Sequence, residues 1–264
     1  MYKILKFELY RAFHGKTFLT ALAIGIALGL IDILMSFIRF GTPPDIVLLS
    51  VWIGSDFQFV WHQVFYLILP ILAALPYGGS YYTDRRRCYD REICLKTSRN
   101  RYLAAKTCAV FISSFVCITL PLCLNLFIAA GLYPDLKPQV LDPSTLSVID
   151  TGLFSSLFFA DPVWFCLAYI IVDGLFAGVI GLMAFAVTGL CRSHFMTVTF
   201  PWLFCMICNT VFETNEKLFS WSPLYMIDPI NSRVQWYQML TVYLLLFAGS
   251  VSCIFVSYGK KDIL

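Results

Sequence analysis

The chain has 264 residues, of which 59% are hydrophobic and 13% are charged, and its mean hydropathy is +0.76. Soluble globular domains carry about 25% charged residues, so this chain has too little polar surface for a water-exposed fold. The same composition excludes disordered, collagen-like and nucleic-acid-reading proteins. The net charge of +3 identifies no partner until the charges are placed along the chain.

The first fifteen residues predict an amphipathic helix. Apolar side chains recur at helical spacing, while basic and polar side chains fall mostly elsewhere. The apolar set is Met1, Ile4, Leu5, Leu9, Ala12 and Phe13. A basic amphipathic helix lies in the headgroup region of a membrane, and Gly15 permits a bend into the segment that follows.

Long segments with almost no charge fill most of the remaining chain. A helix needs roughly 20 apolar residues to cross a bilayer, and its backbone must satisfy its own hydrogen bonds there. The segments lack the alternation typical of a β-barrel. The sequence therefore predicts an all-α polytopic fold, a single membrane domain over 1–264 with six spans. The spans cover about 17–38, 58–80, 104–130, 163–188, 194–212 and 236–257.

The segments between these spans alternate between the two sides of the membrane, so six spans place both termini on one side. Lys and Arg concentrate on that side, and only Arg39, Lys137, Lys217 and Arg233 fall on the other. Because cytoplasmic segments carry the excess of basic residues, we expect both termini to be cytoplasmic. The external loops are then 39–57, 131–162 and 213–235, and residues 145–160 predict an interfacial or re-entrant helix in the second of them.

Glycines recur at four-residue spacing in two spans, as Gly25 and Gly29 in the first and as Gly174 and Gly178 in the fourth. This spacing lets two helix backbones approach closely in lipid. It is compatible with packing inside the chain and with a dimer interface.

We find no catalytic, metal or cofactor site in the sequence, and the phosphate-binding GxxxxGK[ST] loop does not occur. Ionisable groups inside spans are costly and face an interior, a cavity or a partner. Asp32, Asn125 and Asp173 are therefore candidates for a translocation pathway. Alternatively, Asp32 pairs near the outer interface with Arg39, and Asn125 joins two helices through hydrogen bonds.

The strongest polar constellation is the segment 84–101, here called the charged connector, which links spans two and three. It mixes acidic, basic and apolar side chains. A short helix of this kind can dock into a cleft of a soluble partner. The candidate docking residues are Asp84, Arg85, Arg86, Arg87, Tyr89, Asp90, Arg91 and Glu92. Basic residues that fix orientation and bind anionic lipid are the alternative.

Together these features resemble the membrane subunit of ABC-2 type transporters. Four features correspond to that family's membrane subunit. They are the amphipathic start, the six spans, the charged connector and the Ser222-Pro223-Leu224 turn before the last span. The segment 98–106 is similar to the family's stretch between the coupling helix and span three, whereas Cys88 and Thr97 depart from the family's pattern.

The resemblance implies a permease without enzymatic activity, an exporter in a bacterial plasma membrane. A separate ATPase subunit would bind ATP and Mg²⁺ and dock on the charged connector. A second permease subunit, identical or different, would complete the pathway, and membrane lipid would surround it. The substrate would be a peptide, an antibiotic or a lipid-like molecule.

Two other functions remain open from the residues alone. An ATP-independent carrier or channel would use Asp32 and Asp173 for ion or proton movement. A membrane scaffold or sensor would bind a partner without transporting anything. The helix kinks predicted by the prolines within the spans would then have no explanation; these are Pro70, Pro76, Pro121 and Pro201.

Overall fold

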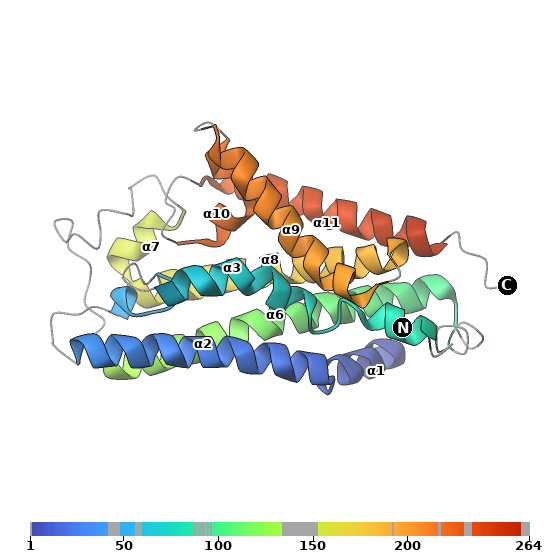
Figure 1. The fold of residues 1–264 in the computed structure, drawn as a ribbon, viewed down its shortest axis with the longest axis horizontal. Coiled ribbons are helices and arrows are strands. Elements are labelled where there is room, and N and C mark those ends of the chain that lie inside the picture. Colours follow the sequence, from blue (N-terminus) through green and yellow to red (C-terminus); the bar gives the residue numbers. More distant parts are fainter. Residues whose placement is uncertain are drawn as a thin grey trace.

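The computed structural model describes residues 2–41, 48–55, 60–86, 89, 93, 95, 97–133, 153–191, 193–215, 218–229 and 234–259. Every regular element in these ranges is a helix, and the long helices run side by side in an elongated bundle (Figure 1). The start of α1 (Tyr2–Phe13) and the end of α11 (Trp236–Gly259) lie at the same end of the bundle, here called the terminal end. The opposite end, where α7 (Ser155–Ala160) lies, is called the loop end.

Five helices of the described chain are long and apolar enough to cross a membrane, so the chain is a multi-pass membrane protein. They match five of the predicted spans to within about five residues. These helices are α2 (Lys16–Phe40), α6 (Arg99–Leu132), α8 (Pro162–Leu190), α9 (His194–Glu213) and α11 (Trp236–Gly259). The predicted amphipathic start is also a helix, α1 (Tyr2–Phe13).

The predicted span 58–80 is interrupted in the structure. It consists of α3 (Val60–Ala74), a turn, and then α4 (Ser80–Arg86). Pro76 disfavours helical backbone at the residue before it and cannot donate to the helix. The carbonyl of Pro76 instead accepts a hydrogen bond from Thr17 Oγ1 at 2.9 Å. The break lies near the terminal end and directly precedes α4, whose last residues begin the charged connector.

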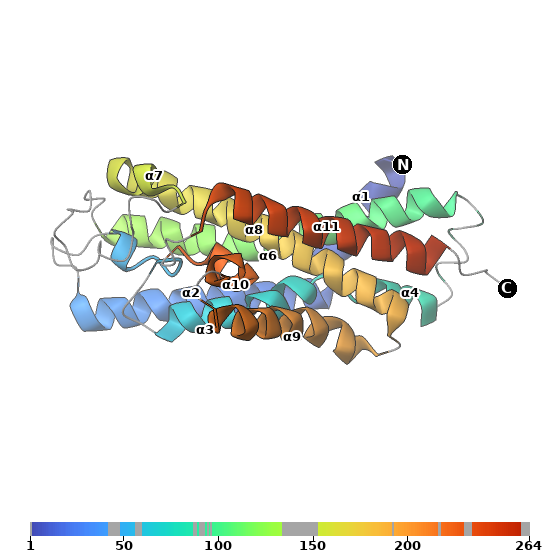
Figure 2. The same ribbon diagram turned by 90° about the horizontal axis from the view of Figure 1, so that it is seen from above.

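Helix α8 forms the centre of the bundle and contacts α3, α6, α9 and α11 (Figure 2). Both glycine motifs are used for packing within the chain. A Cβ at Gly178 would lie 2.5 Å from the ring of Phe111 on α6, and one at Gly25 would lie 2.9 Å from Pro121, also on α6. These glycines let α2 and α8 approach α6 closely, so of the two predicted uses the structure shows the intrachain one.

The segment after α2 is predicted as an external loop over 39–57, but part of it is buried in the structure. Its described part holds η1 (Leu48–Ser50) and a turn to Ser55, and Leu48, Trp52 and Ile53 are fully buried. A buried backbone needs hydrogen-bond partners, and the side chain of Asn125 supplies one to Ile53. The segment therefore fills the interior at the loop end and does not cover the outside of the bundle.

Two short elements occupy the other predicted external segments. Helix α7 covers the last part of the predicted 145–160 helix, and residues 145–152 lie outside the described chain. In the third segment, η2 (Phe219–Trp221) and α10 (Pro223–Ile227) precede α11. Met226 and Ile227 of α10 are buried in the main hydrophobic core, so this turn is packed against the spans.

Candidate functional site

The predicted docking residues divide into two groups. Asp84, Arg85, Arg86 and Tyr89 are described, whereas Arg87, Asp90, Arg91 and Glu92 lie outside the described residues. Arg85 and Arg86 are exposed at the end of α4, where a soluble partner could reach them.

Asp84 points into the protein, although the sequence predicts it as a surface residue. Only 1% of it is exposed. Its carboxylate binds Lys106 of α6, accepts a hydrogen bond from Tyr102 Oη at 3.0 Å, and lies 2.5 Å from Nη2 of Arg11 on α1. Asp84 therefore joins the start of the charged connector to two other helices, and a docking partner would not reach its carboxylate.

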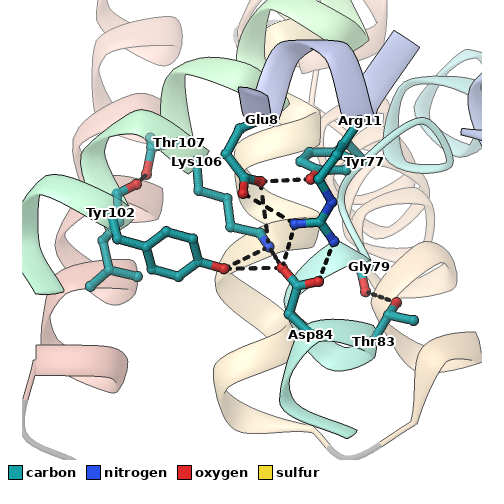
Figure 3. A network of polar contacts seen from close by, with 10 residues as sticks. Glu8, Arg11, Tyr77, Gly79, Thr83, Asp84, Tyr102, Lys106 and Thr107 are labelled. Atoms are coloured by element: carbon teal, nitrogen blue, oxygen red, sulfur yellow. Dashed lines mark hydrogen bonds and ion pairs between the residues drawn. The ribbon is translucent and has the colours of Figure 1, made fainter. Parts of the chain in front are cut away.

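Four charged side chains and two tyrosines complete this group, here called the ionic cluster (Figure 3). Its members are Glu8, Arg11, Tyr77, Asp84, Tyr102 and Lys106. Glu8 of α1 accepts a hydrogen bond from Tyr77 Oη at 2.6 Å and lies 3.1 Å from Arg11 Nη1. Lys106 Nζ donates to Tyr102 Oη at 3.1 Å and lies 3.9 Å from Glu8 Oε2.

Because the ionic cluster is largely buried, its stability depends on the balance between positive and negative charges. Glu8 and Lys106 are fully buried, and Arg11 is 28% exposed. An unpaired buried charge is strongly unfavourable, but here two carboxylates face two cations. The rings of Tyr77 and Tyr102 also lie 5.4 Å from Lys106 Nζ, close enough for cation–π attraction. The cluster therefore holds α1, α4 and α6 together without a net buried charge.

The surroundings of Asp84 shift the pKa of its carboxyl group. Burial alone would raise it, but the Lys106 ammonium and the Arg11 guanidinium outweigh burial and lower it below the ordinary value. Burial likewise opposes the charge of Arg11, yet the hydrogen bond to Asp84 and the attraction of Tyr77, Asp84 and Glu8 together outweigh burial and raise the pKa of Arg11. Both groups are charged at neutral pH.

Acidification should therefore weaken the ionic cluster. A carboxyl group whose pKa is lower in the folded protein stabilises it above the unfolded pKa, about 4 for Asp. This contribution is lost as the pH falls through the folded value. We expect the Tm of the purified chain in detergent to fall below about pH 4. Asp84→Asn should start from a lower Tm and fall less steeply. An equal acid dependence of the two proteins would assign it to other carboxyl groups.

Tyr89 contributes differently from the prediction. Its ring lies 4.4 Å from the guanidinium carbon of Arg11 and 6.5 Å from the ring of Phe7. This connector residue thus packs against Arg11 and Phe7 and extends the contact between the connector and α1. Because the ring of Tyr89 is occupied by contacts within the chain, Arg85 and Arg86 remain as the candidates for partner docking among the described residues.

The sequence prediction missed five of the six residues in the ionic cluster. Glu8 was the residue that could have revealed the cluster. It is acidic, yet it lies between Ile4 and Ala12 on the face of α1 that turns toward the bundle. The sequence around Lys106 gives no indication of a buried ion pair, because Lys106 lies among basic residues that are typical of a cytoplasmic helix end.

The three predicted pathway residues are all buried, but Asn125 and Asp173 serve separate contacts. Asn125 Nδ2 donates to the Gly29 carbonyl at 2.9 Å, and Asn125 Oδ1 accepts from Ile53 N at 3.1 Å. The alternative prediction, a hydrogen-bonded link between helices, is therefore confirmed for Asn125. Asp32 is fully buried on α2.

Asp173 belongs to a second polar group at the loop end. Its Oδ2 accepts a hydrogen bond from Tyr66 Oη at 3.0 Å. One turn away on α3, His62 contacts the Ile53 carbonyl through Nδ1 at 2.6 Å, and its Nε2 lies 3.2 Å from Asp228 Oδ1. His62, Tyr66 and Asp228 line an open cavity of about 320 Å³ between α3, α9 and α10.

Comparison with known proteins identifies no family for this chain, so any proposal about its function rests on its own residues. No protein-family model, curated protein or solved structure matches this chain.

Proposed function

We propose that this chain is the permease subunit of an ABC-2 type exporter in a bacterial plasma membrane. Five apolar helices and the interrupted segment α3–α4 would make six crossings, with both termini in the cytoplasm. The bundle would pair with a second permease subunit, and a separate ATPase with its ATP and Mg²⁺ would supply the energy. The substrate, a peptide, an antibiotic or a lipid-like molecule, would pass between the two permease subunits.

The observation that carries this proposal is the double attachment of Asp84. Its carboxylate binds Arg11 on α1 and Lys106 on α6, so the beginning of the charged connector is fixed to two helices at once. A force applied to the connector would move α1, α4 and α6 as one body. Rigid-body movement of packed elements is a common way to convert a partner's closure into a change elsewhere.

The exposed arginines test the docking part of the proposal. Reversing both charges in Arg85→Glu/Arg86→Glu should lower co-purification of the ATPase roughly tenfold, because attraction becomes repulsion at an ionic surface. The matched control reverses Lys3 and Lys6, two exposed basic residues on α1 at the same end. Unchanged association after reversal at 85 and 86 would contradict docking at this segment.

A second candidate function rests on Asp173. Its Oδ1 is buried and has no hydrogen-bond partner among the described residues, which is the kind of group that an ATP-independent proton- or ion-driven carrier uses. Flux into proteoliposomes that contain only this chain, driven by a proton gradient and lost in Asp173→Asn, would favour the carrier. Absence of flux without the ATPase agrees with the permease.

A further inference from the structure

Two cavities at the terminal end meet at Cys191. The first, here called the arginine pocket, has a volume of about 450 Å³ and is lined by Tyr81, Tyr82, Arg85, Arg86, Thr188 and Cys191. The second, here called the apolar groove, has about 350 Å³ and runs between α8, α9 and α11. Its lining includes Val187, Leu190, Phe200, Phe204, Leu246 and Gly249. Cys191 lines both cavities, so they lie next to each other at the end of α8.

The arginine pocket is electrically positive. No carboxylate is found among the lining residues of either cavity. Within the described part of the chain, neither Arg85 nor Arg86 has an ion-pair partner, in contrast to Arg11 and Lys106. The Arg86 guanidinium lies 5.9 Å from the ring of Tyr82, so an aromatic wall borders the charge. Guanidinium groups match phosphate oxygens in geometry and charge.

The apolar groove lies on helices that are long enough to cross the membrane, so its natural surroundings are lipid chains. Its wall on α11 is open to the outside, where Leu245 is 68% exposed. Figure 2 shows α4 and the ends of α8, α9 and α11 gathered at the terminal end. An apolar groove thus extends into the bilayer from a cationic pocket at its edge.

We propose that these two neighbouring cavities together bind one anionic glycerophospholipid of the leaflet around the terminal end. The phosphate lies between Arg85 and Arg86, and one acyl chain follows the apolar groove past Gly249. Basic pockets at helix ends recognise such headgroups, and burial of the chain adds a favourable free energy for each methylene. Arg85 and Arg86 are also the proposed docking residues for the ATPase, so the lipid site shares these two side chains with that surface and is tested on the purified chain without the ATPase.

Selectivity for the headgroup is tested with the purified chain in detergent. Native mass spectrometry would count bound lipid during titration with phosphatidylglycerol or phosphatidylcholine of identical acyl chains. We expect roughly tenfold stronger binding of phosphatidylglycerol, and loss of this preference in Arg85→Gln/Arg86→Gln. Lys3→Gln/Lys6→Gln removes the same charge from the same end of the bundle and should keep the preference.

The groove is tested separately with a matched pair of glycines. A Cβ added at Gly249 or at Gly131 would meet no described atom within 4 Å, so both positions accept a larger side chain. Gly249→Leu fills the groove and should weaken phosphatidylglycerol binding, whereas Gly131→Leu, remote from both cavities, should not. Gly249 does not line the arginine pocket, so its variant should leave ATPase association unchanged.

Three results would overturn the lipid site. They are equal binding of the two lipids to the unmodified chain, a preference that survives Arg85→Gln/Arg86→Gln, and phosphatidylglycerol binding that is unaffected by Gly249→Leu. Displacement of the lipid by an equal concentration of water-soluble glycerol phosphate would also contradict it, because the pocket would then need no acyl chain. Any of these results, with ATPase association intact, would leave the proposed transport function standing.

Discussion

Replacing Lys106 with alanine is expected to lower the free energy of unfolding by about 3–5 kcal/mol, the usual cost of removing one partner from a buried ion pair. Lys106 is fully buried and faces the carboxylates of Glu8 and Asp84. Without the ammonium, Arg11 alone would remain to balance two negative charges. The attachment of α1 and α4 to α6 should then fail before the rest of the bundle.

The free energy of unfolding is measured in mixed detergent micelles. Unfolding is followed by the reaction of a thiol-reactive dye with Cys117 and Cys166, which are buried in the folded chain. The control is Arg101→Ala, an exposed cation on the same helix, which should change the free energy by no more than about 0.5 kcal/mol. Adding Glu8→Gln to Lys106→Ala should restore part of the loss. If Lys106→Ala resembles Arg101→Ala, the ammonium is not paired in a buried site.

Asn125→Leu should be the second most damaging change, with a loss of about 2–4 kcal/mol. Leucine keeps the approximate size but cannot bind the N–H of Ile53 or the carbonyl of Gly29, both of which Asn125 now satisfies. The N–H of Ile53 would remain buried without its partner, and the segment 48–55 should detach from the interior. Proteolysis within this segment should accompany the loss of stability.

The matched control for this change is Cys123→Leu, an exposed position two residues earlier on α6. It introduces the same side chain on the outer face of the helix and should be nearly neutral. Chemical unfolding of both variants gives the comparison. Equal stability of the two variants would mean that Asn125 does not hold the buried segment.

The membrane-crossing helices were predictable because their signal is local. A run such as 236–257 is uncharged over its whole length, and its lack of charge and its apolar character decide its environment without reference to other parts of the chain. The break after Ala74 also had a local signal in Pro76, Gly78 and Gly79, but the length of the apolar run concealed it.

The ionic cluster was not predictable because its contacts join residues far apart in the chain. Asp84 and Arg11 are separated by 73 positions, and Lys106 follows Asp84 by 22. Each of them looks like an ordinary surface charge near a helix end, and only the packing of α1 onto α6 makes them buried. The sequence drew attention to the segment that begins with Asp84 but assigned this residue to an external partner, whereas the structure pairs it inside the chain.

The glycine motifs show an intermediate case. The spacing at Gly25 and Gly178 correctly predicted close helix contacts, because a missing side chain has the same consequence wherever the partner comes from. The identity of the partner helix required the structure, which places α6 against both glycines through Pro121 and Phe111.

The most direct test of the account is a photo-crosslinking amino acid at position 86 in the full chain, activated in native membranes. The account predicts a crosslink to a nucleotide-binding chain, reduced when Arg85 is changed to Glu in the same protein. The same label at position 6 of α1 should not form it. Crosslinks to lipid alone, with no nucleotide-binding chain co-purifying with the intact assembly, would contradict a motor that acts through the charged connector.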